Sequence, residues 1–513
     1  MTLTPSPGSN GAYSSTHSYR RHALLSFAFP FLVRTIPEVM MADYIVGFDT
    51  LCYYLPVAWD WLNNGIEFWA FFGYAPLFYL VLYCLSVIGV PLFVSLKVLP
   101  PLVHGLLGLA VFLFSTKVLG WMPNKSLLSS LIATLYFVGL RISWDMLRSE
   151  LALVFIFPFF IVLDGVYKGK NTVSPPSDLP ASSHFRCRQY LTLSVLMVLT
   201  ALSHQLVSIL MFITFLGYVV KNFVRGNRPS CAALVLTAIP AGCIFALTAY
   251  ADYAVLTCYF EEAAGGMGSE WLSLFTGDSP VAYTLVIVGF FFFCYLPLLP
   301  FAILGSQGAL HTGLRAWLLA CLIGTAASLV SSGVPLGYRW ILLANFPYAY
   351  LVAEGLLGSR LKPLKKPLAG LAVALSVSFV LLPHGMALPY FSMYPYYFPS
   401  SMLQNSVPLR DCPGVVDALE WVRLNLGNGG VLLVHDAFSG WSLLYAPDVV
   451  TFNYGYSNPE DVAVWLSNEG YDRIFVVWWI PGEGWHGQES LSGSFKEVYR
   501  TGMISVYEFK GVA

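Results

Sequence analysis

Charged residues are scarce in this sequence, and paired cysteine motifs are missing. Only 11% of the 513 residues are charged and 57% are hydrophobic, whereas a soluble globular chain carries about 25% charged residues. A chain with so little polar surface cannot be covered by water, which excludes an ordinary soluble protein. The formal net charge of −1 lacks the positive excess of nucleic-acid-binding domains, so we expect no nucleic-acid partner.

Nine cysteines occur without a single CxxC pair. Only Cys412 lies in the C-terminal segment, which excludes a disulfide within that segment. Cysteines in apolar helices are more often small packing side chains than reactive thiols. We therefore do not expect cysteine chemistry to carry the function.

Long apolar runs are abundant instead. A helix needs roughly 20 apolar residues to span a membrane, and about eleven segments meet or approach this length. They lie near 22–36, 98–117, 126–140, 150–167, 190–203, 206–220, 231–249, 281–304, 316–333, 339–358 and 368–388.

Basic residues orient these spans, because cytoplasmic loops are enriched in Lys and Arg. Six clusters lie between the spans: Arg20/Arg21, Lys117/Lys125, Lys168/Lys170/Arg186/Arg188, Lys221/Arg225/Arg228, Arg315 and Arg360/Lys362/Lys365/Lys366. If all six face the cytoplasm, the chain alternates sides consistently. We predict an α-helical polytopic protein of the cell membrane, with a disordered cytoplasmic tail (1–21), a transmembrane domain (22–388) and an extracytoplasmic α/β domain (389–513).

Residues 66–90 are apolar enough to span but do not fit this alternation. One extra crossing here would place the later basic loops outside, and 25 residues are too few for two crossings. The aromatic side chains and Pro76 suit the headgroup region. We expect interfacial or re-entrant helices in the first outer loop; the alternative is an ordinary span with another segment miscounted.

The C-terminal segment changes to short alternating elements. The runs GGVLLVHD, DVVTF, RIFVVWW and ISVYEF are typical of strands, and PGVVDALEWVRLNL and PEDVAVWLSNEG of helices with Pro in the first turn. This order predicts a small α/β domain.

Charged residues gather where the outer loops meet the spans. The first outer loop contains Arg34, Glu38 and Asp49, and the second runs from Arg141 to Glu150. Taken singly, such residues are often solvated or form structural ion pairs, and a lone His204 is more often a structural group than a catalyst. As a set they suggest a site, because arginines placed outside against the positive-inside bias suit a phosphate held at the interface.

The layout resembles the GT-C superfamily of membrane glycosyltransferases, which take sugar from a polyprenyl-phosphate carrier. The stretch from Gly47 to Tyr54 is similar to the first-loop catalytic motif, which runs like FDPxxxYR in oligosaccharyltransferases, although Thr50 replaces the Pro and no Arg follows. Asp145 resembles the acid of the second loop, and the loop and helix around Arg339 look like those of archaeal members. The stretch from His435 to Asp448 resembles, more weakly, the WWDYG region, but lacks the Trp pair and the Tyr-Gly.

This resemblance implies the roles of the site residues and their partners. Asp49, Asp145 and Glu38 would be catalytic, and Asp49, Asp145 and Glu150 could hold Mg²⁺ or Mn²⁺. The substrate-binding residues would be Arg339, Arg148, His204, Tyr53, Tyr54 and Arg34. The partners would be membrane lipid, a polyprenyl- or dolichol-phosphate-linked sugar donor, and a protein, lipid or glycan acceptor.

Two other classes of protein remain open. A transporter or flippase of lipid-linked sugars would carry charges along a central path, and the predicted spans have few charges away from their ends. A non-catalytic membrane scaffold would give no reason for the positions of Asp49 and Arg339.

Overall fold

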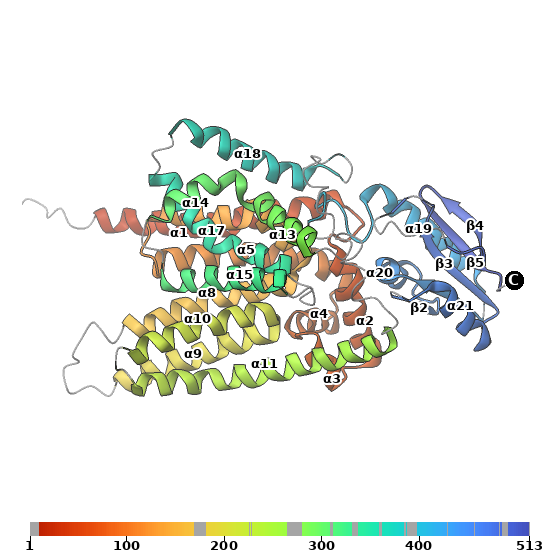
Figure 1. The fold of residues 1–513 in the computed structure, drawn as a ribbon, viewed down its shortest axis with the longest axis horizontal. Coiled ribbons are helices and arrows are strands. Elements are labelled where there is room, and N and C mark those ends of the chain that lie inside the picture. Colours follow the sequence, from red (N-terminus) through yellow and green to blue (C-terminus); the bar gives the residue numbers. More distant parts are fainter. Residues whose placement is uncertain are drawn as a thin grey trace, which may run out of the picture.

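The computed structural model describes most of the chain. It covers residues 10–168, 181–224, 226, 228–263, 280–307, 311–330, 337–358, 362–383, 386, 398–427, 429–455, 457–481, 483–484 and 491–511. A helical bundle forms one end of the molecule and a small sheet domain the other (Figure 1). The expected domain boundary at residue 389 lies outside the described residues.

The bundle helices coincide with the eleven segments that the sequence predicts. They are α1 (Asn10–Met40), α5 (Leu92–Lys117), α6 (Pro123–Leu135), α7 (Phe137–Asp145), α8 (Leu147–Lys168), α9 (Ala181–Ser203), α10 (Gln205–Val224), α11 (Arg228–Ala263), α13 (Pro280–Tyr295), η2 (Leu296–Leu298), α14 (Leu299–Gly305), α15 (Thr312–Val330), α16 (Gly337–Leu343), α17 (Asn345–Gly358) and α18 (Lys362–Leu381). Helix α1 begins at Asn10, inside the segment expected to be a tail.

Among the described residues, seven helices are long and apolar enough to cross a membrane, and an eighth crossing results if the bent pair α6–α7 is one span. The two helices of this pair meet at 56°. Helices α9, α10 and α15 contain shorter apolar stretches of 10–17 residues. The chain is therefore a multi-pass membrane protein, as predicted, although fewer helices than the expected eleven reach full spanning length.

Short helices fill the first outer loop between α1 and α5. They are the π-helix η1 (Thr50–Tyr54), α2 (Leu55–Asn64), α3 (Phe68–Gly73) and α4 (Leu77–Val87). A break at Ala75 (φ 49°) and Pro76 separates α3 from α4. At 1.5 Å per residue, the 11 residues of α4 reach about 16 Å, half of the hydrocarbon thickness. The segment 66–90 therefore does not form one spanning helix, which agrees with the interfacial reading.

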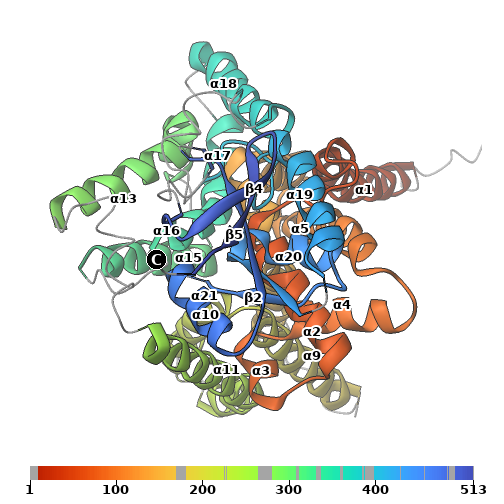
Figure 2. The same ribbon diagram turned by 90° about the vertical axis from the view of Figure 1, so that its right-hand side faces the viewer.

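The C-terminal domain is a five-stranded mixed sheet with three helices and the 3-10 turn η4 (Leu409–Asp411). Its elements are α19 (Cys412–Asn425), β1 (Gly430–Val434), α20 (Asp436–Tyr445), β2 (Thr451–Asn453), α21 (Pro459–Asn468), β3 (Arg473–Trp479), β4 (Phe495–Thr501) and β5 (Ile504–Phe509). The strand order is β2-β1-β3-β5-β4. Strands β2, β1 and β3 are parallel, and β5 and β4 complete the sheet antiparallel (Figure 2).

This arrangement confirms the predicted α/β class. Each predicted strand and helix is present, whereas strand β4, helix α20 and the turn η4 were missed at the level of sequence. Three of the seven residues of β4 are exposed and only one is buried, as expected for an edge strand with little apolar pattern.

Candidate active site

The first outer loop meets the end of α7 at a glycine turn. Gly47 has φ +98°, and a Cβ atom at this position would overlap the carbonyl oxygen of Trp144. The Gly47 amide and the Trp144 indole both donate hydrogen bonds to the Gln404 carbonyl oxygen, at 3.2 and 3.1 Å. This turn holds Asp49, two residues later, beside the C-terminal end of α7.

Asp145 is the last residue of α7, and its position is fixed from two sides. Its carboxylate forms a buried ion pair with Arg141, one helical turn earlier. Its carbonyl oxygen accepts a hydrogen bond of 2.9 Å from the buried Tyr54 hydroxyl. Tyr54 therefore positions Asp145, and its hydroxyl is already engaged within the protein.

Asp49 lies in an electrostatic environment made by four charged residues. Burial and the neighbouring Asp145 carboxylate raise the pKa of Asp49 to about 7, and the guanidinium groups of Arg339, Arg141 and Arg148 act in the opposite direction. Within the described part of the chain, the Asp49 carboxylate has no hydrogen-bond or ion-pair partner. The structure thus brings Asp49, Asp145, Arg148 and Arg339 to one place.

Two arginines of this group are not neutralised by a carboxylate in ion-pair contact among the described residues. Arg148 donates a hydrogen bond to the Tyr74 carbonyl oxygen and lies over the rings of Tyr54 and Tyr79. Arg339 donates to the Tyr338 hydroxyl at 3.2 Å. An anion at this place would gain charge-assisted hydrogen bonds that the protein itself leaves unmade.

The turn between α9 and α10 brings a neutral side chain, His204, to the same place. His204 is 5% exposed, and its Nδ1 atom has no hydrogen-bond partner among the described residues; the same is true of the buried Nε2 atom of Gln205. Burial holds the pKa of His204 well below its ordinary value, and the charges of Arg148 and Arg339 lower it further. His204 is therefore neutral and lies near both arginines.

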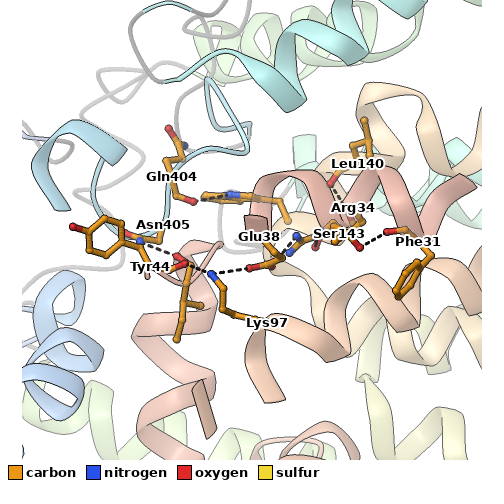
Figure 3. A network of polar contacts seen from close by, with 12 residues as sticks. Phe31, Arg34, Glu38, Tyr44, Lys97, Leu140, Ser143, Gln404 and Asn405 are labelled. Carbon is orange, nitrogen blue, oxygen red and sulfur yellow. Dashed lines mark hydrogen bonds and ion pairs between the residues drawn. The ribbon is translucent and has the colours of Figure 1, made fainter. Parts of the chain in front are cut away.

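Arg34 and Glu38 are occupied elsewhere. Arg34 is fully buried and bonds to the Glu38 carboxylate at 2.8 Å and to the Ser143 carbonyl oxygen at 3.0 Å. Lys97 lies 3.8 Å from Glu38 and donates to the Tyr44 carbonyl oxygen at 2.7 Å (Figure 3). This network ties α1, α5, α7 and the loop after α1 together. Arg34 and Glu38 are engaged in it, and their binding and catalytic roles stay predictions.

The predicted metal ligands do not assemble. Glu150 is fully buried and its carboxylate lies 2.5 Å from Nδ1 of the buried His104, while Asp145 is paired with Arg141. No group of three His, Cys, Asp or Glu side chains that could hold a metal ion occurs among the described residues. Glu150 faces into the bundle toward His104 on α5, so the structure does not bring the three carboxylates together, and their role as metal ligands stays a prediction.

The remaining predicted residue, Tyr53, is 38% exposed on the outer loop. Sequence reasoning assigned no role to Arg141 or Gln205, although both stand in the loops that it singled out. Their signal was position alone: Gln205 follows His204, and Arg141 precedes Asp145 by one helical turn, both at span ends.

The C-terminal domain packs against this region. A Cβ atom on Gly440 of α20 would overlap the Leu51 carbonyl oxygen in η1, so the two helices are in backbone contact. Burial raises the pKa of the Cys52 thiol, and the charges of Asp436, Asp49 and Asp145 raise it further, which places the Asp436 carboxylate on the same side. His435 caps α20 through Nδ1, and burial lowers its pKa to about 4.

The fold combines a bundle of apolar helices, a loop that carries an acid, and a small sheet domain docked on that loop. The structure is similar to the oligosaccharyltransferase of Archaeoglobus fulgidus in its apo form, with a TM-score of 0.50 and 13% identity over 89% of this chain and 69% of that chain. ArnT from Cupriavidus metallidurans, solved with undecaprenyl phosphate, gives a TM-score of 0.47 and 12% identity over 94% and 97% of the two chains. The sequence itself matches no family model and no curated protein.

Proposed function

We propose that this chain is a glycosyltransferase that moves a sugar from a polyprenyl-phosphate carrier to an acceptor at the outer face of the membrane. The observation that carries the proposal is the carboxylate of Asp49 beside two guanidinium groups, Arg148 and Arg339, that form no ion pair with a carboxylate among the described residues. An acid and an anion-binding pair in one place are what sugar transfer from a phosphate requires.

The transfer step assigns a role to each group. The acceptor X–H bond breaks and its proton passes to Asp49, while X forms a bond to the anomeric carbon of the sugar. The bond from that carbon to the phosphate oxygen breaks, and its electron pair leaves with the phosphate. Arg148 and Arg339 stabilise the charge that builds on the leaving phosphate, and Arg141 with Tyr54 keeps Asp145 in place. Because the predicted metal ligands are not assembled, no step is assigned to a metal.

The remaining parts of the molecule support this assignment. The lipid tail needs an apolar surface next to the phosphate, and α3 exposes Phe68 and Trp69, which are 60% and 52% accessible. Tyr79 on α4 packs against Tyr54 and lies under Arg148, so a helix of the same loop contacts one of the two arginines. The proposal places the C-terminal domain, with Asp436, on the extracytoplasmic side, where it would face the acceptor.

A thermal-shift titration with a polyprenyl phosphate tests the proposal through Arg339. A planar guanidinium fork is not reproduced by Lys, so Arg339→Lys should lose at least tenfold in apparent affinity for the lipid phosphate while the melting temperature without ligand barely changes. The matched control is Arg315→Lys, at an exposed position on α15, which should behave like wild type. No stabilisation of the wild type by the lipid phosphate would contradict the proposal and favour a scaffold.

A further inference from the structure

The charges around Asp49 limit the number of negative charges that the substrate phosphate can carry. Two carboxylates, Asp49 and Asp145, and three guanidinium groups, Arg141, Arg148 and Arg339, act on one another here. Asp145 and Arg141 neutralise each other in their ion pair. The charges left for a ligand are therefore Arg148 and Arg339, with Asp49 as the only opposing carboxylate of this set.

We call Arg148, Arg339, His204 and Gln205 the wall of the proposed site. His204 and Gln205 add hydrogen-bonding groups to this wall but no charge. His204 is neutral. Its Nδ1 atom and the Nε2 atom of Gln205 are buried and have no hydrogen-bond partner in the described part of the chain. The same holds for Nε of Arg148. Neutral groups can bond phosphate oxygens but cannot compensate a further negative charge, and an uncompensated charge in a buried site is costly.

The number of phosphates decides how many charges must be matched. A sugar linked through one phosphate carries one negative charge, and its leaving group becomes a phosphate monoester with up to two, because the second pKa of a monoester is about 6. Two guanidinium groups match that product. A diphosphate leaving group carries a further charge, and the carboxylate that could help to hold a compensating cation, Glu150, is committed to His104 at 2.5 Å.

We propose that the donor of this enzyme carries a single phosphate, as a polyprenyl monophosphate-linked sugar, and that Arg148, Arg339, His204 and Gln205 select it against the diphosphate. This inference rests on the proposed function and names the substrate class of that same site.

A matched pair of short lipids tests the selection with the full-length protein in detergent. Farnesyl phosphate and farnesyl diphosphate have the same tail and differ by one phosphate, and farnesol reports the tail alone. Thermal-shift titrations at pH 7.5, with EDTA and again with Mg²⁺, give the apparent affinities. Farnesyl phosphate should bind at least tenfold more tightly than farnesyl diphosphate in both buffers.

The outcomes separate the two proposals. A preference below tenfold, or tighter binding of the diphosphate in either buffer, overturns the inference and leaves the proposed function standing. If neither phosphate binds more tightly than farnesol, the proposed function itself fails.

A charge-addition variant provides a second measurement. Gln205→Lys adds a third cation to the wall, so the folded variant should bind farnesyl diphosphate more tightly than wild type does and reduce the preference at least threefold. An unchanged preference in the folded variant would contradict the role of this wall. Should the variant not fold, the wild-type comparison still decides the question.

Discussion

At the scale of single residues, the outer loops contain two kinds of charged side chain that look alike in the sequence. Arg34 and Glu38 are buried and bonded to each other, so their desolvation is offset within the protein. Asp49, Arg148 and Arg339 are brought together without ion-pair contacts to carboxylate or guanidinium among the described residues, although each charge acts on the others. A charged side chain that has no ion-pair partner at a partly buried position is a candidate for binding an oppositely charged ligand.

Replacing Asp49 tests its role as the base. Asp49→Asn keeps the shape and removes the charge, so it should lower sugar transfer roughly 10²-fold or more, the usual scale for loss of a general base. Asp43→Asn is the control, because Asp43 is exposed in the same loop and should retain wild-type activity. Transfer at the parental rate by purified, folded Asp49→Asn protein would show that Asp49 is not the base.

The raised pKa of Asp49 predicts a pH dependence. Burial and Asp145 bring this pKa to about 7, and only the ionised carboxylate accepts a proton. Transfer should therefore increase as pH rises from about 6 to 8 and then level off, since the ionised fraction is nearly complete one unit above the pKa. Rates measured over this range check the expectation, and the residual activity of Asp49→Asn should not show the same rise. A flat wild-type profile would argue against Asp49 as the titrating base.

At the scale of elements, the site depends on the docking of α20 against η1. η1 directly follows Asp49 in the chain, and α20 directly follows His435 at the end of β1. The backbone contact at Gly440 joins them, and the Tyr445 hydroxyl donates to the Asp43 carbonyl oxygen at 3.2 Å. The sheet domain therefore supports the loop that carries the acid and is more than an appendage of the bundle.

A single added methyl group tests this contact. In Gly440→Ala the new Cβ would overlap the Leu51 carbonyl oxygen, so α20 must shift away from η1 and transfer should fall at least tenfold. Gly493→Ala is the control, because a Cβ atom there meets nothing within 4 Å. Activity and limited proteolysis of both variants measure the effect. Wild-type activity in Gly440→Ala would mean that the loop holds Asp49 without support from α20.

At the scale of the whole molecule, the charges and the apolar helices define two ends. The N-terminus of α1, the C-terminal end of α8 and the N-terminal end of α9 lie at one end of the bundle, and the sheet domain lies at the other (Figure 1). Asp49, Arg148 and Arg339 lie at the end nearer the sheet domain. This separation suits the proposed transfer, because the lipid carrier and the acceptor must meet at one edge of the bilayer.

Reporter fusions test the orientation of these two ends. A reporter placed after residue 513 should be active outside the cytoplasm, and one placed in the loop near Pro175, outside the described residues, should be active inside, because the basic clusters favour the cytoplasmic side. Periplasmic-type and cytoplasmic-type reporters fused at both positions give opposite signals if this is right. The same side for both would mean an odd number of crossings fewer or more, with residues 66–90 as the first segment to reconsider.

The amino-acid sequence determined by itself what depends on local composition. Apolar runs of membrane length predicted each bundle helix, alternating apolar residues predicted four of the five strands, and Pro76 with its aromatic neighbours predicted the interruption in residues 66–90. Acids and arginines at span ends also identified the region of the site, because charged side chains close to the membrane are energetically costly and are therefore often functional.

Only the tertiary structure decided which of those charges share a partner. Glu150 and Asp145 stand five residues apart in one loop, yet the turn between α7 and α8 directs Glu150 toward His104 on α5 and leaves Asp145 beside Asp49. His204 and Arg148 come from different loops, yet the charge of Arg148 acts on His204. Pairing between residues far apart in the chain depends on how helices pack, and local sequence carries no record of it.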